Sequence, residues 1–126
     1  MKIIVYSLTG NCKRFVDMCE IPKEDVIYLQ DIDYDVDFDY ILITPTFGFG
    51  EVPAAVSKFL VENHMYLKGV VGSGNKNWGE RFANASEIIS EEYDVPLLMK
   101  IELHGSKKDI SEFKKIYLES VKNGEI

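Results

Sequence analysis

Short apolar runs that alternate with segments of helical periodicity constrain this chain most strongly. Runs with almost no polar residue are typical of parallel strands that helices cover on both faces. Because strand–helix alternation with short connections forms βαβ units, we predict an α/β fold with a parallel sheet. The last run admits Lys100 and Glu102, which indicates a strand near an edge. The five predicted strands lie at 2–7, 26–29, 40–44, 69–72 and 97–103.

Helical periodicity predicts about four helices between these strands. Pro53 is a favoured first helical residue, and Asp109 followed by Glu112 matches a capping-box pattern. At 126 residues the chain is long enough for one domain. We therefore expect a single three-layer sandwich over residues 1–126. Its helices are predicted at about 12–19, 53–62, 78–92 and from Asp109 onward.

The charge balance argues against nucleic acid and membrane partners. Fourteen Lys and Arg stand against twenty-one Asp and Glu, a net charge of −7, and such a surface repels phosphate backbones and anionic lipid. No apolar run approaches the roughly 18–20 residues that span a bilayer, and the first run is too short for a signal peptide. We therefore expect a cytoplasmic protein.

Metal and disulfide chemistry have little support in the sequence. Cys12 and Cys19 form no C-x-x-C motif, and His64 and His104 lie far from both. The alternating aspartates of 31–39 lack the glycine and the closing glutamate of a calcium-binding loop. We interpret them as a solvated face and expect no metal site.

Three glycine- and hydroxyl-rich loops follow predicted strands, at 7–12, 44–52 and 72–80. In a parallel sheet, ligands bind beyond the carboxyl ends of the strands. The coincidence of these loops with that edge predicts a binding site there.

The first loop, S-L-T-G-N-C, is suited to a phosphate group. Ser7 and Thr9 offer hydroxyl groups, Gly10 lets the backbone bend, and the following helix offers unpaired N–H groups. Four or five charge-assisted hydrogen bonds of about 1.5–3 kcal/mol each match the roughly 8 kcal/mol of micromolar binding. A plain strand-to-helix turn capped by Asn11 is the alternative interpretation.

Other phosphate-binding motifs are excluded by named residues. The loop has neither G-x-x-x-x-G-K-[ST] nor G-x-G-x-x-G. A tyrosine phosphatase cradle would need an arginine six residues after Cys12, where Met18 stands, and a phospho-receiver domain would need an aspartate at Thr44 or Pro45.

The second and third loops, T-P-T-F-G-F-G-E-V-P and G-S-G-N-K-N-W-G-E-R-F, place aromatic rings beside glycines. Two such loops can stack on a flat heteroaromatic ring and hydrogen-bond its edge. Together with a phosphate seat, they indicate FMN. The alternative for Trp78 is a core anchor of the third helix, and the two roles are compatible.

These three stretches also resemble known proteins. S-L-T-G-N-C-K-R-F is similar to the flavodoxin phosphate loop, and the other two look like the NrdI family of flavodoxin-like FMN proteins. The resemblance implies sheet order 2-1-3-4-5 and FMN as cofactor. A departure is Cys12, where many flavodoxins have threonine. The implied FMN-binding residues are Ser7, Thr9, Gly10, Asn11, Cys12, Thr46, Phe47, Gly48, Phe49, Gly50, Ser73, Gly74, Asn75, Asn77, Trp78 and Gly79.

The resemblance further implies a redox accessory protein of class Ib ribonucleotide reductase, which activates another enzyme. In the NrdI family, reduced FMN reacts with dioxygen and supplies superoxide for assembling the dimanganese–tyrosyl radical cofactor of the small subunit NrdF. A flavin or flavodoxin reductase is the implied electron donor. The alternatives are a general electron-transfer flavodoxin and an interaction domain that has lost FMN.

The ring-binding loops also carry a redox hypothesis. Residues 44–50 and 72–79 contain no Asp or Glu, and this favours reduced flavin more than the acidic surroundings of an electron carrier do. Glu51 and Glu80 flank the loops and weaken this effect if they turn inward. A peptide beside Gly48 or Gly50 can rotate, because glycine accepts positive φ.

Overall fold

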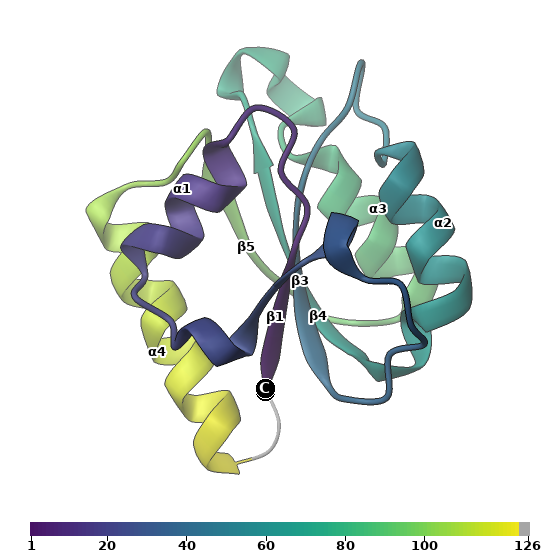
Figure 1. Cartoon of the computed structure of the whole chain (residues 1–126). Coiled ribbons are helices and arrows are strands. Elements are labelled where there is room, and N and C mark those ends of the chain that lie inside the picture. Colours follow the sequence, from purple (N-terminus) through teal and green to yellow (C-terminus); the bar gives the residue numbers. More distant parts are fainter. Residues whose placement is uncertain (124–126) are drawn as a thin grey trace.

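The computed structural model describes residues 1–123, and its centre is a five-stranded parallel sheet in the order β2-β1-β3-β4-β5 (Figure 1). This confirms the predicted flavodoxin-like sheet, including β5 at an edge. Lys2 is paired with Tyr40, and Val5 with Ile43, in the register of β1 and β3. The strands are β1 (Lys2–Val5), β2 (Val26–Tyr28), β3 (Tyr40–Pro45), β4 (Leu67–Gly74) and β5 (Leu97–Glu102).

Four α-helices cover the two faces of the sheet (Figure 1). They are α1 (Asn11–Met18), α2 (Ala54–Asn63), α3 (Asn84–Tyr93) and α4 (Lys107–Asn123). Alternate residues of β1 divide between the two cores. Ile3 packs in the core with Phe15 of α1 and Phe113 of α4, whereas Ile4 packs in the core formed with α2 and α3.

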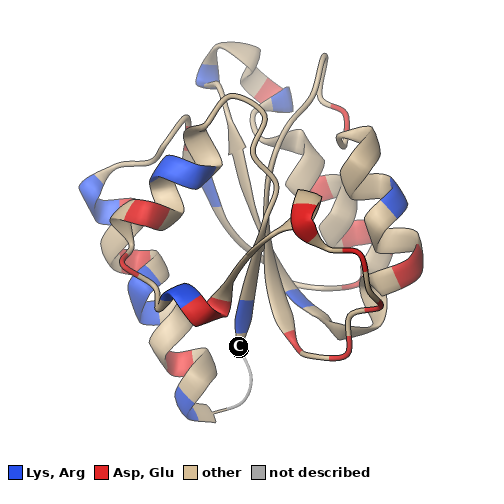
Figure 2. Cartoon of the chain, viewed as in Figure 1, with Lys and Arg blue, Asp and Glu red and all other residues tan. Residues whose placement is uncertain are grey.

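The connection from β2 to β3 contains the acidic segment, here residues 31–39 (Figure 2). Its aspartates from Asp31 to Asp37 are exposed while Val36 is buried, as the alternation predicts. The buried side chain of Asn63 fixes this segment, because its Oδ1 accepts the Val36 N–H at 2.8 Å. Within residues 1–123, no group of three or more acidic, histidine or cysteine side chains is arranged to hold a metal ion.

Two predicted helix starts are wrong. Residues 76–81 form a separate 3₁₀ segment, η4 (Lys76–Arg81), which is kinked at Gly79. Helix α3 begins only after Ala83, whose φ of +51° interrupts the helical path. The fourth helix begins at Lys107, ahead of Asp109. Its capping box pairs Ser106 with Asp109, because the Ser106 N–H donates to Asp109 Oδ2 at 2.9 Å and the Asp109 N–H donates to Ser106 Oγ at 3.1 Å.

Over residues 1–123, none of the helices combines the length and the apolar character that crossing a bilayer requires.

Candidate functional site

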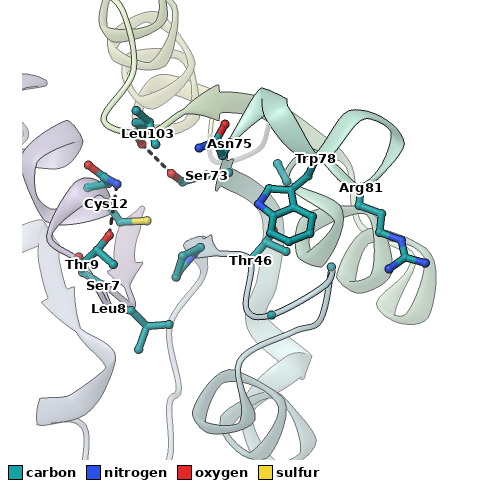
Figure 3. Close-up of a pocket in the computed structure, with 16 residues that line it drawn as sticks. Ser7, Leu8, Thr9, Cys12, Thr46, Ser73, Asn75, Trp78, Arg81 and Leu103 are labelled. Atoms are coloured by element: carbon teal, nitrogen blue, oxygen red, sulfur yellow. Dashed lines mark hydrogen bonds between the residues drawn. The ribbon is translucent and has the colours of Figure 1, made fainter.

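A cleft opens at the carboxyl edge of the sheet, between the loops that follow β1, β3, β4 and β5 (Figure 3). Ser7, Thr9 and Cys12 lie on one side of it, and Thr46 and Trp78 lie on the other. The parallel strands bring these distant segments together because all of their carboxyl ends meet at this edge. The lining residues are Ser7, Leu8, Thr9, Asn11, Cys12, Pro45, Thr46, Gly48, Gly50, Ser73, Gly74, Asn75, Trp78, Arg81, Ala83 and Leu103.

The loop after β1 presents unused donors at the start of α1. Gly10 caps this helix with φ +91°, and no side chain caps it. In the part of the chain that the structure describes, the N–H groups of Asn11 and Cys12 donate no hydrogen bond. The Thr9 hydroxyl accepts from Asn11 Nδ2 at 3.2 Å. Free N–H groups and the helix dipole together favour an anion at this end of the cleft.

Cys12 lines the cleft as a neutral thiol. Burial raises the pKa of this thiol to about 12, and its hydrogen bond with Ser73 opposes the shift only in part. Because the thiolate is the nucleophilic form, Cys12 is unreactive near neutral pH. It contributes a small apolar surface and a weak donor.

The loop after β3 closes into a tight turn at Phe47–Glu51. The N–H groups of Phe47 and Glu51 each donate to the other residue's carbonyl at 2.8 Å. Gly48 has φ +55° and Gly50 has φ +112°. These values lie in the region that favours glycine, so the turn depends on both glycines.

Three hydrogen bonds attach this turn and the preceding Thr46 to the region around the start of α3. Arg81 Nη1 donates to the Phe49 carbonyl at 3.0 Å, and Asn84 Nδ2 donates to the Gly50 carbonyl at 2.8 Å. Thr46 Oγ1 accepts the Ala85 N–H at 3.2 Å. The peptide between Gly48 and Phe49 differs, because neither its C=O nor its N–H has a hydrogen-bond partner among the described residues. It is therefore the peptide of this turn with the greatest freedom to rotate.

The loop after β4 presents Trp78 at the mouth of the cleft. Asn75 shapes the loop, since its Oδ1 accepts the Asn77 N–H at 2.9 Å. Trp78 is 48% exposed and precedes α3. The interpretation of Trp78 as a core anchor of the third helix is therefore wrong.

Close packing explains two glycines of this region. A Cβ atom on Gly72 would lie 2.1 Å from Ser86 Oγ, and one on Gly74 would lie 2.5 Å from the Ala83 backbone nitrogen. Strand β4 thus needs glycine at both positions to approach α3, whatever the cleft binds.

A fourth loop, after β5, completes the cleft through Leu103. This residue has φ +55°, which is strained for leucine. Two bonds to β4 hold it there: the Ser73 hydroxyl donates to the Leu103 carbonyl at 2.6 Å, and the Leu103 N–H donates to the Gly74 carbonyl at 2.9 Å. This loop is absent from the sites expected from the sequence, although β5 ends at the same edge of the sheet.

Among the described residues, Arg81 is the one charged residue in the lining. Glu51 does not line the cleft, but its carboxylate approaches the turn: Oε1 lies 3.6 Å from where a Cβ atom on Gly48 would be. Thus one carboxylate does turn toward the second loop.

A sequence match over most of the chain decides the family. Residues 3–115 match the sequence model of the NrdI flavodoxin-like family. The chain belongs to this family.

Solved structures of flavodoxins share the fold of this NrdI flavodoxin-like chain. Oxidised flavodoxin 1 from Bacillus cereus is 20% identical, with TM-score 0.69 and 96% of each chain covered. The FMN-bound flavodoxin from Fusobacterium nucleatum is 21% identical, with TM-score 0.64 and the same coverage. A mutant flavodoxin from Pseudomonas aeruginosa is 17% identical, with TM-score 0.65, and the match covers 98% of this chain and 100% of that one.

The structure brings most of the sequence-predicted site residues to the cleft. Gly10 and Gly79 lie outside the lining, as do Phe47, Phe49 and Asn77. Gly10 and Asn77 instead shape the loops, as a helix cap and as a partner of Asn75. The lining residues that were not predicted are Leu8, Pro45, Arg81, Ala83 and Leu103.

Proposed function

We propose that this chain binds FMN in the cleft and acts as a redox accessory protein of class Ib ribonucleotide reductase. The observation that carries the proposal is that the two ends of one cleft differ in their chemistry. One end has free helix N-terminal N–H groups and hydroxyls, and the other has an exposed indole beside glycine-rich backbone. Membership of the NrdI flavodoxin-like family supports the same cofactor.

In this proposal the phosphate lies at the start of α1. The N–H groups of Asn11 and Cys12 and the hydroxyl groups of Ser7 and Thr9 hold it. No lysine or arginine of this loop lines the cleft, so the N–H groups and the helix dipole supply the attraction. The FMN-bound flavodoxin of Fusobacterium nucleatum, which shares this fold, supports the proposal.

The flavin ring lies between the turn at Gly48–Gly50 and the loop at Asn75–Trp78. The indole of Trp78 would stack on the ring, and the Gly48–Phe49 peptide would be available to hydrogen-bond its polar edge. FMN, when bound, supplies one- and two-electron redox chemistry, including the reduction of dioxygen to superoxide.

The partner in this proposal is the radical-bearing small subunit NrdF. It docks on the mouth of the cleft, where exposed apolar side chains from four loops surround the opening. Superoxide then travels a short distance to the partner's dimanganese site. A flavin or flavodoxin reductase supplies the electrons. The apolar residues of the mouth are Leu8, Phe47, Phe49, Trp78 and Leu103.

A cofactor-assembly assay tests this function. FMN-loaded protein is reduced, mixed with a manganese-loaded class Ib small subunit and oxygen, and examined by EPR for a tyrosyl radical. We expect radical that depends on the reduced protein and decreases when superoxide dismutase is added. An electron-carrier flavodoxin serves as the control.

Two results would overturn the proposal. If the flavodoxin control yields as much radical, the chain is a general electron-transfer flavodoxin. If the chain binds no FMN, it is an interaction domain with a flavodoxin-like fold.

A further inference from the structure

We propose that Arg81 is a positioning residue that fixes the 47–51 turn and places an unneutralised positive charge beside the ring-binding end of the cleft. This inference rests on the proposed function, which places FMN in the cleft. In this inference, the positive charge of Arg81 makes the site bind reduced flavin more tightly relative to oxidised flavin.

The positioning role follows from the hydrogen bonds of the turn. Arg81 Nη1 donates to the Phe49 carbonyl at 3.0 Å. The neighbouring Gly50 N–H donates to the Phe47 carbonyl at 3.2 Å. Both ends of the Phe49–Gly50 peptide are therefore held, whereas the Gly48–Phe49 peptide is free among the described residues. Arg81 thus limits rotation in this turn to a single peptide.

The close approach of Arg81 to Gly50 supports the same role. A Cβ atom on Gly50 would lie 3.4 Å from both Cβ and Cδ of Arg81. The arginine side chain therefore packs along the turn as well as bonding to it, and Asn84 Nδ2 holds the following carbonyl at 2.8 Å. In Figure 3 Arg81 lies beyond Trp78, on the side of the cleft opposite Cys12. Arg81 therefore joins the turn to the segment that carries Trp78.

The charge role follows from the surroundings of the Arg81 guanidinium. Among the ion pairs of residues 1–123, none involves Arg81, and its hydrogen-bond acceptor is a neutral carbonyl. Of the residues 1–123 that line the cleft, Arg81 alone is charged. A positive charge stabilises an anion nearby, and deprotonated reduced flavin carries one more negative charge than oxidised flavin does.

Arg14 provides a matched control. It is the other arginine of the chain, is exposed on α1 and lies outside the lining. Arg14→Gln changes the net charge by the same amount as Arg81→Gln. Far-UV circular dichroism and the thermal midpoint of both variants establish that they fold.

Hydrogen exchange in the FMN-free protein tests the positioning role. We expect the Gly50 and Glu51 amides to exchange several-fold faster in Arg81→Gln than in Arg14→Gln. In Arg81→Lys they should also exchange faster, because a single ammonium group replaces the planar donor. Equal exchange in Arg81→Gln and Arg14→Gln would overturn the positioning role.

Potentiometry with bound FMN tests the charge role. We expect Arg81→Gln to lose about tenfold in affinity for reduced relative to oxidised FMN, which lowers the two-electron midpoint potential by about 30 mV. Arg81→Lys should recover more than half of this shift, and Arg14→Gln should show less than a twofold change. Equal potentials in Arg81→Gln and wild type would overturn the charge role.

A wild-type chain that binds no FMN would overturn both the proposed function and the charge role. The exchange measurement uses FMN-free protein, so it still decides the positioning role.

Discussion

The indole of Trp78 meets the ring of Phe49 edge-on, with ring centroids 5.5 Å apart and an interplanar angle of 83°. The two residues come from different loops, and both remain exposed, at 48% and 66%. An edge-to-face pair gains only about 0.5–1.5 kcal/mol beyond the area that it buries. Such a large exposed aromatic surface beside a cleft therefore points to a further binding partner for the two rings.

Replacing Trp78 tests whether the indole stacks on the ligand. We expect Trp78→Ala to weaken FMN binding by about 1–2 kcal/mol, or roughly 5–30-fold, while Trp78→Phe retains most of the affinity. Because Trp78 is the single tryptophan, the titration should follow flavin fluorescence or heat. Tyr34→Ala, at an exposed aromatic of the acidic segment, is the control. Equal affinities for all three variants would contradict the stacking role.

The glycines of the turn should differ in their tolerance of side chains. Gly50 has φ +112°, and a Cβ atom there would lie 3.2 Å from Asn84 Nδ2. We expect Gly50→Val to lower the free energy of unfolding by about 1–3 kcal/mol and to weaken FMN binding. Urea denaturation and FMN titration measure the two effects.

The Gly48 position should affect redox behaviour more than stability, because a Cβ atom there meets only Glu51. We expect Gly48→Val to slow the oxidation of the reduced flavoprotein by dioxygen, since valine resists the positive φ of +55°. Gly48→Asn is the matched variant, because asparagine tolerates this conformation. Stopped-flow absorbance with air-saturated buffer measures the rate. Equal rates for valine and asparagine would argue against a role for backbone rotation.

Glu51 should oppose the formation of reduced flavin, because its carboxylate turns toward Gly48. We expect Glu51→Gln to raise the potential for the second electron by on the order of 20–60 mV in such exposed surroundings. Glu80→Gln, in the exposed part of η4, should change it less. Potentiometry in low and high salt provides the measurement, and the shift should shrink as salt screens the charge.

Stability should depend on pH through Asp25 and Tyr117, which join the turn before β2 to α4. Burial acts to raise the pKa of Asp25, but hydrogen bonds from Tyr117 and Lys2 outweigh it and lower the pKa below 3.8. Burial and the Asp25 contact raise the pKa of Tyr117 from 10.0 to about 12.

The signs of the two shifts set two pH windows. A lowered carboxylate pKa stabilises the fold above pH 3.8, and this contribution is lost as the pH falls through the lower folded value. A raised tyrosine pKa stabilises the fold below pH 10, and this contribution is lost between pH 10 and about 12. Urea denaturation of wild type and Asp25→Asn across both windows tests this. A variant whose stability falls as steeply as that of wild type in acid would contradict the assignment.

The predictable parts of this protein are those that regular periodicity governs. Continuous apolar runs predicted the strands. Because ligands bind at the carboxyl ends of parallel strands, three of the four cleft loops could then be predicted. The third helix was misplaced because Trp78 keeps helical spacing with the residues of α3, while the positive φ values at Gly79 and Ala83 break the helical path between them. Arg81 and Leu103 were not predicted as site residues, because their roles depend on carbonyl and hydroxyl partners far along the chain.

A titration of the purified chain with FMN tests the central claim most directly. Binding to the cleft should quench the fluorescence of Trp78 in step with the appearance of protein-bound flavin absorbance, with one FMN per chain. We predict a dissociation constant on the order of 1 μM or lower. A chain that stays colourless, with tryptophan emission unchanged at saturating FMN, would contradict the account.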